Sequence, residues 1–431
     1  MKILVISAHY PPYHSGGYEI RIKNIVDELA QRDHLIHVIT SKIPRKTKKN
    51  DSNLNYSVIR KLHEKSQKKD WIVNLTMHSL TRLFGSVLVF IRQLIHDIFD
   101  LRVIDHEIMR FHPDIIYLGH ILPLTKTLLP FLADCHKPII LDDGGATLLY
   151  SHQDKGLWFK FIEGDLNNFP INLAIVNILR KIIGTISKYR LKPAFKIPEN
   201  IHIIFKREAN LIAVRAAGIP FNHAVVLPSG VDAHLFKFLE RDALSLPIRI
   251  IYPARIEPRK GQLDALALLS QLTNTGFDTQ LTLVGEARSS YMIDIQEKIN
   301  LLDISSYLKV VPMIPHEELV SLYHQADICF FPSLQKQGLS RVPLEAMACG
   351  CVVISYGNEG SNEIIRDNEN GFLVSIGDYD AVIAIIKELI ANSQKFTRIT
   401  TQARNDVENK YDLKEYVGKI EETILEFIKG N

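Results

Sequence analysis

Short apolar runs alternate with amphipathic stretches along the chain, and most of these runs end in glycine or polar residues. In the first half the runs are KILVIS (Lys2–Ser7), LIHVIT (Leu35–Thr40), DIIYLGH (Asp114–His120), PIILDDGG (Pro138–Gly145) and HAVVLPSGVD (His223–Asp232). After the first run, YEIRIKNIVDELAQ places Ile22, Ile25 and Leu29 on one helical face. Such runs are typical of strands buried in a parallel sheet, so this half is predicted to have an α/β fold.

The same alternation restarts after RDALSLP (Arg241–Pro247), a predicted linker. Strands are predicted at IRIIYPAR, TQLTLVGEA, YLKVVPM, DICFFPS, CVVISYG and GFLV, with a helix at QLDALALLSQL. We expect two Rossmann-like, doubly wound α/β domains facing a deep interdomain cleft, the usual place for a ligand. The predicted bounds are 1–240 for the first domain and 241–411 for the second. Residues 412–431 are expected to form a terminal helix that packs back towards the first.

Composition narrows the choice of protein class. A net charge of +3 over 431 residues gives no general argument for nucleic-acid binding. The most apolar stretch, LTRLFGSVLVFIRQLIHDIFD, is broken by Arg82, Arg92 and Asp97, whereas a membrane span needs roughly 18 uninterrupted apolar residues. The opening MKILVIS lacks a signal-peptide cleavage region, and the four cysteines form no CxxC pair. A cytoplasmic protein with free thiols is predicted.

Two basic segments interrupt the alternation. Residues 42–69 are rich in lysine, and residues 171–197, within a predicted basic insertion at about 150–200, contain several bases and no acid. The second segment alternates apolar turns with bases such as Arg180, Lys181 and Lys188. This composition suits a helix lying on anionic lipid at the inner membrane face, and equally an ordinary surface helix with a solvated basic face.

Two features point to the binding of a phosphate-bearing ligand. PARIEPRKGQ places Arg255 and Lys260 just after a buried strand, where paired bases suit a multiply charged anion. In the first half, the turn at Gly16 and Gly17 leaves backbone amides open to an anion at the start of a helix. Each feature alone is common, but a cationic strand end facing a glycine turn across a cleft is more specific.

The stretch SLQKQGLSRVPLEAMACG (Ser333–Gly350) completes this picture. A polar loop follows a predicted strand, and a helix is expected to begin near Gly338–Ser340 with its early amides towards the same anion. Glu345, just inside that helix, is placed to accept hydrogen bonds from vicinal hydroxyls such as those of a ribose. The alternative is a solvated first-turn acid that complements the helix dipole.

The sequence resembles the retaining glycosyltransferases of family four, which have the GT-B fold and use nucleotide-sugar donors. The resemblance covers nearly the whole chain and is strongest from Ile248 to Val374. It rests on KILVISAHYPPYHSGGYE, VVLPSGVD, PARIEPRKG, GLSRVPLEAMACG and GSNEIIRDNENGFLV. It implies a hexosyltransferase-like enzyme that moves a sugar from a UDP-, GDP- or ADP-linked donor to a saccharide or lipid-linked acceptor. It also implies that no metal and no further cofactor is needed.

The resemblance also implies roles for single residues. Arg255 and Lys260 match the basic pair that holds the donor diphosphate and stabilises the leaving group, and His120 matches an active-site histidine near the transferred sugar. Glu345 matches the second acid of an E-x7-E motif, which binds the ribose. The whole predicted set is listed here: catalytic Arg255, Lys260 and His120; donor-binding Gly16, Gly17, Arg255, Lys260, Gln337, Gly338, Leu339, Ser340 and Glu345.

Gln337 departs from the family pattern. It stands eight residues before Glu345, where the family has the first motif acid, which holds hydroxyls of the donor sugar. An amide keeps one acceptor oxygen but loses the charge, and hydrogen bonds to charged groups are stronger by about 1 kcal/mol. Two functions therefore stay open. One is an active transferase in cell-surface polysaccharide or glycolipid synthesis, and the other is a catalytically weak sugar-nucleotide-binding partner of another transferase.

Overall fold

The computed structural model describes most of the chain, in the ranges 1–13, 16–43, 54–64, 80–145, 147–153, 197–286 and 290–430, with backbone only for 80–90. The chain forms two compact units. Unit 1 consists of Met1–Leu227 and Lys419–Asn431, and unit 2 consists of Pro228–Gly418. Arg180, Lys181 and Lys188, and most of the predicted basic insertion, lie outside the described residues.

Unit 1 is built on a parallel sheet in the order β3-β2-β1-β4-β5-β6-β7. Its strands are β1 (Lys2–Ser7), β2 (Leu35–Ser41), β3 (Ser57–Leu62), β4 (Ile115–Leu118), β5 (Ile139–Asp143), β6 (Ile201–Phe205) and β7 (His223–Val226). The five strands predicted for this half are confirmed, whereas β3 and β6 were not predicted. Strand β3 lies within the lysine-rich segment 42–69 and pairs with β2, so part of that segment belongs to the sheet.

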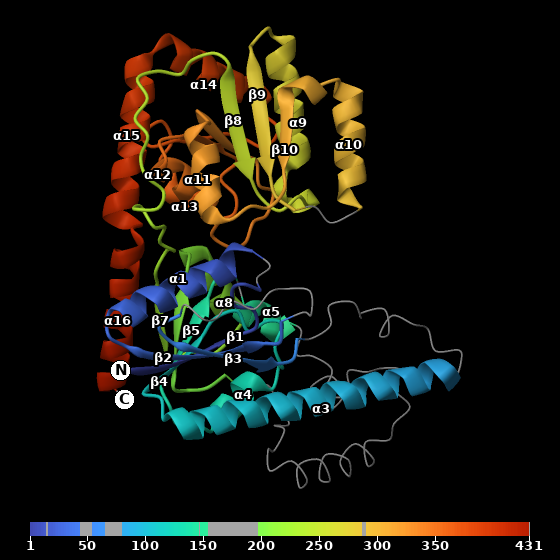
Figure 1. The fold of residues 1–431 in the computed structure, drawn as a ribbon, viewed down its shortest axis with the longest axis vertical. Coiled ribbons are helices and arrows are strands. Elements are labelled where there is room, and N and C mark those ends of the chain that lie inside the picture. The colour runs from blue at the N-terminus through green and yellow to red at the C-terminus, as the bar shows by residue number, and fades with distance from the viewer. Residues whose placement is uncertain are drawn as a thin grey trace. The chain divides into compact units, whose positions relative to one another are not determined.

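The described helices of unit 1 are α1 (Gly17–Gln31), α3 (Leu80–Phe111), α4 (Leu128–Leu132), α5 (Thr147–Gln153) and α8 (Glu208–Ala216). Helix α3 is the long helix in Figure 1, and its Ile104 and Ile108 belong to the apolar core beneath the sheet. The stretch considered for a membrane span forms the first part of this helix. Among the described residues, no helix is long and apolar enough to cross a bilayer.

Unit 2 repeats the plan with a six-stranded parallel sheet in the order β10-β9-β8-β11-β12-β13. The strands are β8 (Ile248–Pro253), β9 (Thr279–Val284), β10 (Leu308–Val311), β11 (Ile328–Phe331), β12 (Val352–Ser355) and β13 (Phe372–Leu373). All six predicted strands are confirmed. Each half thus has the strand order 3-2-1-4-5 of a Rossmann-like sheet, whose ligands bind beyond the carboxyl ends of the strands.

Helices cover both faces of the sheet in unit 2. They are α9 (Gln262–Asn274), α10 (Tyr291–Leu302), α11 (His316–His324), α12 (Val342–Ala348), α13 (Ser361–Ile364), α14 (Tyr379–Ala391) and α15 (Ser393–Lys410). Successive residues of β8 point to opposite faces: Ile250 packs in one apolar core with α9 and α14, and Ile251 packs in the other with α12 and α15. The predicted doubly wound architecture follows from this alternation.

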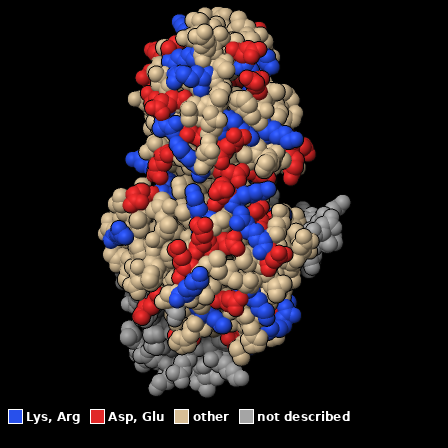
Figure 2. Space-filling model, turned by 90° about the vertical axis from the view of Figure 1, so that its left-hand side faces the viewer, with Lys and Arg blue, Asp and Glu red and all other residues tan. Residues whose placement is uncertain are grey.

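The terminal helix α16 (Leu413–Gly430) begins in unit 2 and ends in unit 1. In unit 1, Glu421 accepts hydrogen bonds from Arg32 at 3.1 Å and from His34 at 2.8 Å, while Phe427 packs against His202 and His223. Both chain ends therefore lie in unit 1 (Figure 1). On the face in Figure 2, basic and acidic side chains are interspersed, in keeping with the net charge of +3.

Candidate active site

A cluster of two histidines and one glutamate lies at the carboxyl ends of β1 and β4 in unit 1. His9 follows β1 and His120 follows β4, while Glu19 comes from the first turn of α1. Glu19 Oε1 lies 2.8 Å from His120 Nδ1 and 3.3 Å from His9 Nδ1. A Cβ on Gly119 would approach Ile22 Cγ1 at 3.2 Å, so the absence of a side chain lets α1 pack closely against this strand end.

Hydrogen bonds and charges within this cluster shift the pKa values of His9 and Glu19 in opposite directions. Burial lowers the pKa of His9, but hydrogen bonds to Glu19 and Glu64 and the charges of these acids outweigh it and raise that pKa to about 9. Burial acts to raise the pKa of Glu19, yet the hydrogen bonds from His120 and His9 hold it well below its ordinary value. His9 is therefore an imidazolium and Glu19 a carboxylate at neutral pH. A carboxylate on Nδ1 of His120 makes that nitrogen the donor, so in the neutral ring Nε2 is the acceptor.

The same three side chains form a possible metal-ligand set. One ligand atom from each of His9, Glu19 and His120 lies within 4.8 Å of the others, within the part of the chain that the structure describes. The distances from Glu19 Oε1 to the two histidine nitrogens are also those of hydrogen bonds, so hydrogen bonds without a metal ion account for the arrangement. The expectation of metal-independent activity stays a prediction.

Asp142 lies beside this cluster at the end of β5 and is fully buried. Its Oδ1 is 2.8 Å from Arg21 Nη2 and 3.0 Å from Lys206 Nζ, and its Oδ2 accepts from the hydroxyl of Tyr117 at 2.7 Å. The neighbouring Asp143 accepts hydrogen bonds from backbone amides at the start of α5, at 2.7 Å for Thr147. These two acids therefore hold buried cations and a helix start.

In unit 2, the predicted cations lie beyond the carboxyl end of β8. Arg255 is two residues past the strand, and its Nη2 lies 3.5 Å from Glu257 Oε1, which also accepts from Arg259 Nε at 2.9 Å. The Arg255 side chain is 38% exposed, so its guanidinium is open to a ligand. Gln262, at the start of α9, donates to the Arg255 carbonyl at 2.9 Å and holds the backbone of this loop.

Lys260 is buried more deeply and is paired with an acid that the sequence analysis did not predict. Its Nζ lies 2.5 and 2.6 Å from the two carboxylate oxygens of Glu359, which follows β12, and Ser333 Oγ donates to Glu359 at 2.7 Å. Burial lowers the pKa of Lys260, while the charge of Glu359 opposes that shift. The next residue, Gly261, has φ +72°, and a Cβ there would lie 2.0 Å from the Pro332 carbonyl oxygen, so only glycine fits.

The loop after β11 joins these residues. The Leu334 amide donates to the Arg259 carbonyl at 3.0 Å, and the Ser340 amide donates to the Glu359 carbonyl at 3.0 Å. Gly338 is buried with φ +90°, whereas Gln337 is exposed. The backbone carbonyl of Gln337 accepts a hydrogen bond from the side-chain amide of Gln335 at 2.8 Å. Helix α12 begins at Val342, slightly later than the predicted start near Gly338–Ser340.

Glu345 lies in the first turn of α12, as predicted, and is only 3% exposed. It accepts a hydrogen bond from the hydroxyl of Tyr323 at 3.2 Å and lies 3.7 Å from Arg341 Nη2. The interpretation of Glu345 as a solvated helix-start acid is therefore wrong. Tyr323 and Arg341 supply partners that a buried carboxylate needs, and the predicted ribose contact stays a prediction.

The structure brings part of the predicted set together within each unit. In unit 2, Arg255, Lys260 and the loop 333–340 share the carboxyl ends of β8 and β11. In unit 1, Gly17 begins α1, whose first-turn Glu19 contacts His120. Glu19 was detectable in principle as the acid two residues after the glycine turn, but Glu359 has no local signal because it lies 99 residues from Lys260.

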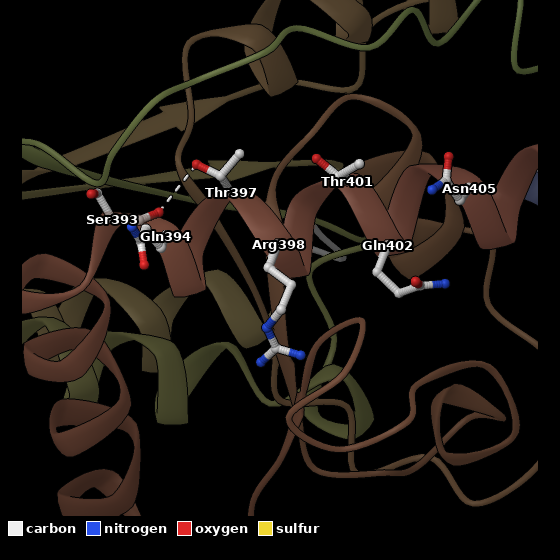
Figure 3. Close-up of a pocket in the computed structure, with 7 residues that line it drawn as sticks. All are labelled: Ser393, Gln394, Thr397, Arg398, Thr401, Gln402 and Asn405. Carbon is white, nitrogen blue, oxygen red and sulfur yellow. Dashed lines mark hydrogen bonds between the residues drawn. The ribbon is translucent and has the colours of Figure 1, made fainter.

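A separate hollow in unit 2 lies along one face of α15 and is shown in Figure 3. It is lined by Ser393, Gln394, Thr397, Arg398, Thr401, Gln402 and Asn405. Arg398 donates to the Asn368 carbonyl at 3.1 Å, so its charge already has a partner at this surface. The hollow contains none of the predicted site residues.

Residues 241–406 match the family model described as Glycosyl transferases group 1. The amylovoran biosynthesis glycosyltransferase AmsK of Erwinia amylovora is 29% identical over 204 residues, which are 46% of this chain and 49% of that protein. The chain spans about half the length of the curated relatives it matches.

Several solved structures resemble the whole chain, among them the following two. Sucrose-phosphate synthase of Thermosynechococcus elongatus has a TM-score of 0.70 with 17% identity, over 100% of both chains. HepE of Anabaena, in complex with UDP-glucose, has a TM-score of 0.64 with 17% identity, over 99% of this chain and 100% of that one. At such identities the likeness concerns the fold, and it confirms the predicted pair of Rossmann-like domains of the GT-B type.

Proposed function

We propose that the protein is a retaining glycosyltransferase that moves a sugar from a nucleotide-diphosphate donor to a hydroxyl of a saccharide or lipid-linked acceptor. One observation carries this proposal. Two cations, Arg255 and Lys260, lie beyond the end of β8, and a buried first-turn acid, Glu345, lies in the helix that follows β11. This arrangement falls within residues 241–406, which match the group 1 family model.

The chemistry follows from these charges. When the bond between C1 of the sugar and the diphosphate oxygen breaks, negative charge grows on the departing phosphate. Arg255 and Lys260 stabilise that charge more in the transition state than in the ground state, which accelerates the step. The acceptor oxygen bonds to C1 from the same face, and its proton passes to the leaving phosphate oxygen. Glu345 holds the ribose hydroxyls and takes no part in bond breaking.

The histidine cluster of unit 1 serves the transferred sugar in this proposal. Glu19 accepts a hydrogen bond from His120 Nδ1, which fixes the ring. The Nε2 atom is proposed to accept a hydrogen bond from a hydroxyl of the transferred sugar. The amides of Gly16 and Gly17, at the start of α1, bind a phosphate or acceptor oxygen. No metal is assigned a role, since the two cations supply the positive charge that the leaving group needs.

The setting we propose is the synthesis of a cell-surface polysaccharide or glycolipid in the cytoplasm. It is supported by the name of the relative AmsK, an amylovoran biosynthesis glycosyltransferase. Peripheral contact with an anionic membrane is part of the proposal and rests on the basic composition of residues 171–197. Vesicles of phosphatidylglycerol and phosphatidylethanolamine should bind the protein in a salt-sensitive way. Unchanged binding after neutralising Arg180, Lys181 and Lys188 would exclude this segment as the anchor.

A donor screen tests the enzymatic proposal. UDP-, GDP- and ADP-sugars are offered with a panel of saccharide and lipid-linked acceptors, and nucleotide release is measured. We expect one donor class to be consumed with a suitable acceptor, and Lys260→Met to abolish that release. If donors bind and none is consumed, the protein is instead a sugar-nucleotide-binding partner of another transferase. The exposed amide at Gln337 favours this alternative function.

A further inference from the structure

Glu359 adopts a backbone conformation that is unusual for its residue type. Its φ is +50°, in the left-handed region, and it precedes Gly360, whose φ is +79°. A long L side chain rarely adopts this conformation, and it persists where surrounding contacts hold it in place. Residues with such backbone conformations cluster at ligand-binding and active sites. The contacts that hold Glu359 in this conformation therefore bear on its function.

The contacts of Glu359 come from three neighbouring strand ends. Its carboxylate is bonded by Lys260, which follows β8, and by Ser333, which follows β11, while its own loop follows β12. Its carbonyl accepts from the Ser340 amide at 3.0 Å. Strands β8, β11 and β12 are adjacent in the sheet, and the side chain is buried, with Glu359 only 7% exposed. The carboxylate therefore lies at the carboxyl edge where a ligand of this sheet would bind.

Gln337 differs from Glu359 in both charge and burial. It occupies the position of the first motif acid, yet it carries no charge and its side chain is exposed. The loop that contains it is connected to Glu359 through Ser340. Unit 2 thus has a carboxylate beside the diphosphate-binding lysine, but this carboxylate comes from the loop after β12 and not from the loop after β11.

We propose that Glu359 is the acid of the donor-sugar subsite and supplies the charged acceptor that the amide of Gln337 lacks. The inference rests on the proposed function and deepens it. When the donor diphosphate binds Lys260, the Lys260 ammonium contacts both the diphosphate and the Glu359 carboxylate. The carboxylate then also accepts hydrogen bonds from hydroxyls of the transferred sugar, and such hydrogen bonds are charge-assisted and directional. A carboxylate at this place selects a neutral hexosyl group, because the carboxylate of a uronic acid would be repelled by the like charge.

The test separates recognition of the sugar from recognition of the nucleotide. For each protein, calorimetry measures the Kd of a nucleotide-sugar and of its parent nucleoside diphosphate, with UDP-glucose and UDP, GDP-mannose and GDP, and ADP-glucose and ADP. Four proteins are compared: wild type, Glu359→Gln, Gln337→Glu and the double variant. Glu369→Gln is the matched control, since that acid lies in the next loop and its side chain is 59% exposed.

We expect Glu359→Gln to weaken binding of the preferred nucleotide-sugar at least tenfold and to change the Kd of the nucleoside diphosphate less than threefold. The double variant, which returns the acid to position 337, should regain most of this loss, and wild type should bind UDP-glucuronate at least tenfold more weakly than UDP-glucose. Equal loss for nucleotide-sugar and nucleoside diphosphate would overturn the proposal, because Glu359 would then only hold Lys260. No loss at all would overturn it as well.

Two further measurements keep the outcome interpretable. If Glu359→Gln unfolds because Lys260 is left buried beside an amide, Glu359→Asp keeps the charge and withdraws it by one methylene, and the same loss of sugar recognition is expected. Turnover is measured separately with the donor panel. A protein that shows the Glu359-dependent sugar recognition but consumes no donor would contradict the enzymatic function and leave the subsite assignment intact, so the two failures are distinguishable.

Discussion

Two buried lysines, one in each unit, follow the carboxyl end of a parallel strand and reach a carboxylate. Lys206 comes directly after β6 and is fully buried, with its Nζ 3.0 Å from Asp142 Oδ1. Lys260 lies beyond β8, is 8% exposed, and binds both oxygens of Glu359. Burial lowers the pKa of both, for Lys206 to about 8, and the partner acid opposes the shift in each case.

What differs is how many partners the acid already has. Asp142 is completely buried and is held by Arg21, Lys206 and Tyr117, so the cluster leaves no surface for a ligand. The Lys260 pair lies beside Arg255, whose side chain is 38% exposed, and beside the loop that contains Gln337. The comparison teaches that a buried ion pair supports the fold where it is closed on all sides. The proposed role of the Lys260 pair in ligand binding depends on its open side, which the exposed Arg255 marks.

The largest effect is expected at the closed cluster. Asp142→Ala leaves two buried cations, Arg21 and Lys206, without their carboxylate, and should lower the free energy of unfolding by about 3–5 kcal/mol. Urea denaturation measures this loss, with the surface variant Glu369→Gln expected to change it by less than about 0.5 kcal/mol. A loss below about 1 kcal/mol would show that the cluster is not the support that its burial indicates.

The open pair should respond in activity instead. Lys260→Met removes the charge that stabilises the leaving phosphate and should lower kcat/KM by about 100- to 1,000-fold. The free energy of unfolding should fall by less than for Asp142→Ala, because one buried charge instead of two loses its partner and Glu359 keeps its hydrogen bond from Ser333. Nucleotide release and urea denaturation are measured on the same preparation. A stability loss as large as that of Asp142→Ala, with activity retained, would reverse the comparison.

A smaller effect is expected in the pH dependence of unit 1. The pKa of His9 is raised from 6.5 to about 9, so its ion pairs with Glu19 and Glu64 stabilise the fold fully below pH 6.5, and this contribution is lost as the pH rises through 9. The difference in unfolding free energy between wild type and His9→Gln should shrink by about 2 kcal/mol between pH 6.5 and 9.5. A difference that stays constant over this range would mean that His9 is not held as an imidazolium.

The smallest effect is expected from metal removal. Since protons account for the contacts of Glu19 with His9 and His120, dialysis against EDTA should change kcat by less than about twofold, and added Mg²⁺, Mn²⁺ or Zn²⁺ should not raise it further. A loss of more than tenfold that zinc or manganese restores would convert this cluster into a metal centre. Such a result would also mean that the histidine cluster of unit 1 depends on a metal, unlike the site of unit 2, which is proposed to act through Arg255 and Lys260.

Much of the fold was predictable because apolar runs bounded by turns are local signals. All six strands of unit 2 and five of the seven of unit 1 were predicted from such runs. Strand β3 was missed because Arg60 and Lys61 interrupt its apolar pattern, and bases of this kind are tolerated at the edge of a sheet. Strand β6 was missed because it follows a long basic stretch, and a histidine, His202, interrupts its apolar run.

The candidate site was predictable to a smaller extent. Arg255, Lys260 and Glu345 could be selected because strand ends and helix starts carry them, and the assigned roles stay predictions. The deep burial of Glu345 could not be foreseen, because it depends on Tyr323 and Arg341 packing around the helix start. The pairing of Lys260 with Glu359 joins loops after different strands, and no local pattern announces a partner 99 residues away.

The sequence by itself determined the alternation of strands and helices, the two Rossmann-like halves, and the types of charged residue at the strand ends. These follow from the spacing of apolar positions, which is a property of neighbours along the chain. Only the tertiary structure decided which acid meets which base. Parallel strands bring distant loops to one edge of a sheet, so the carboxylate beside Lys260 comes from Glu359, and the amide at position 337 is left exposed.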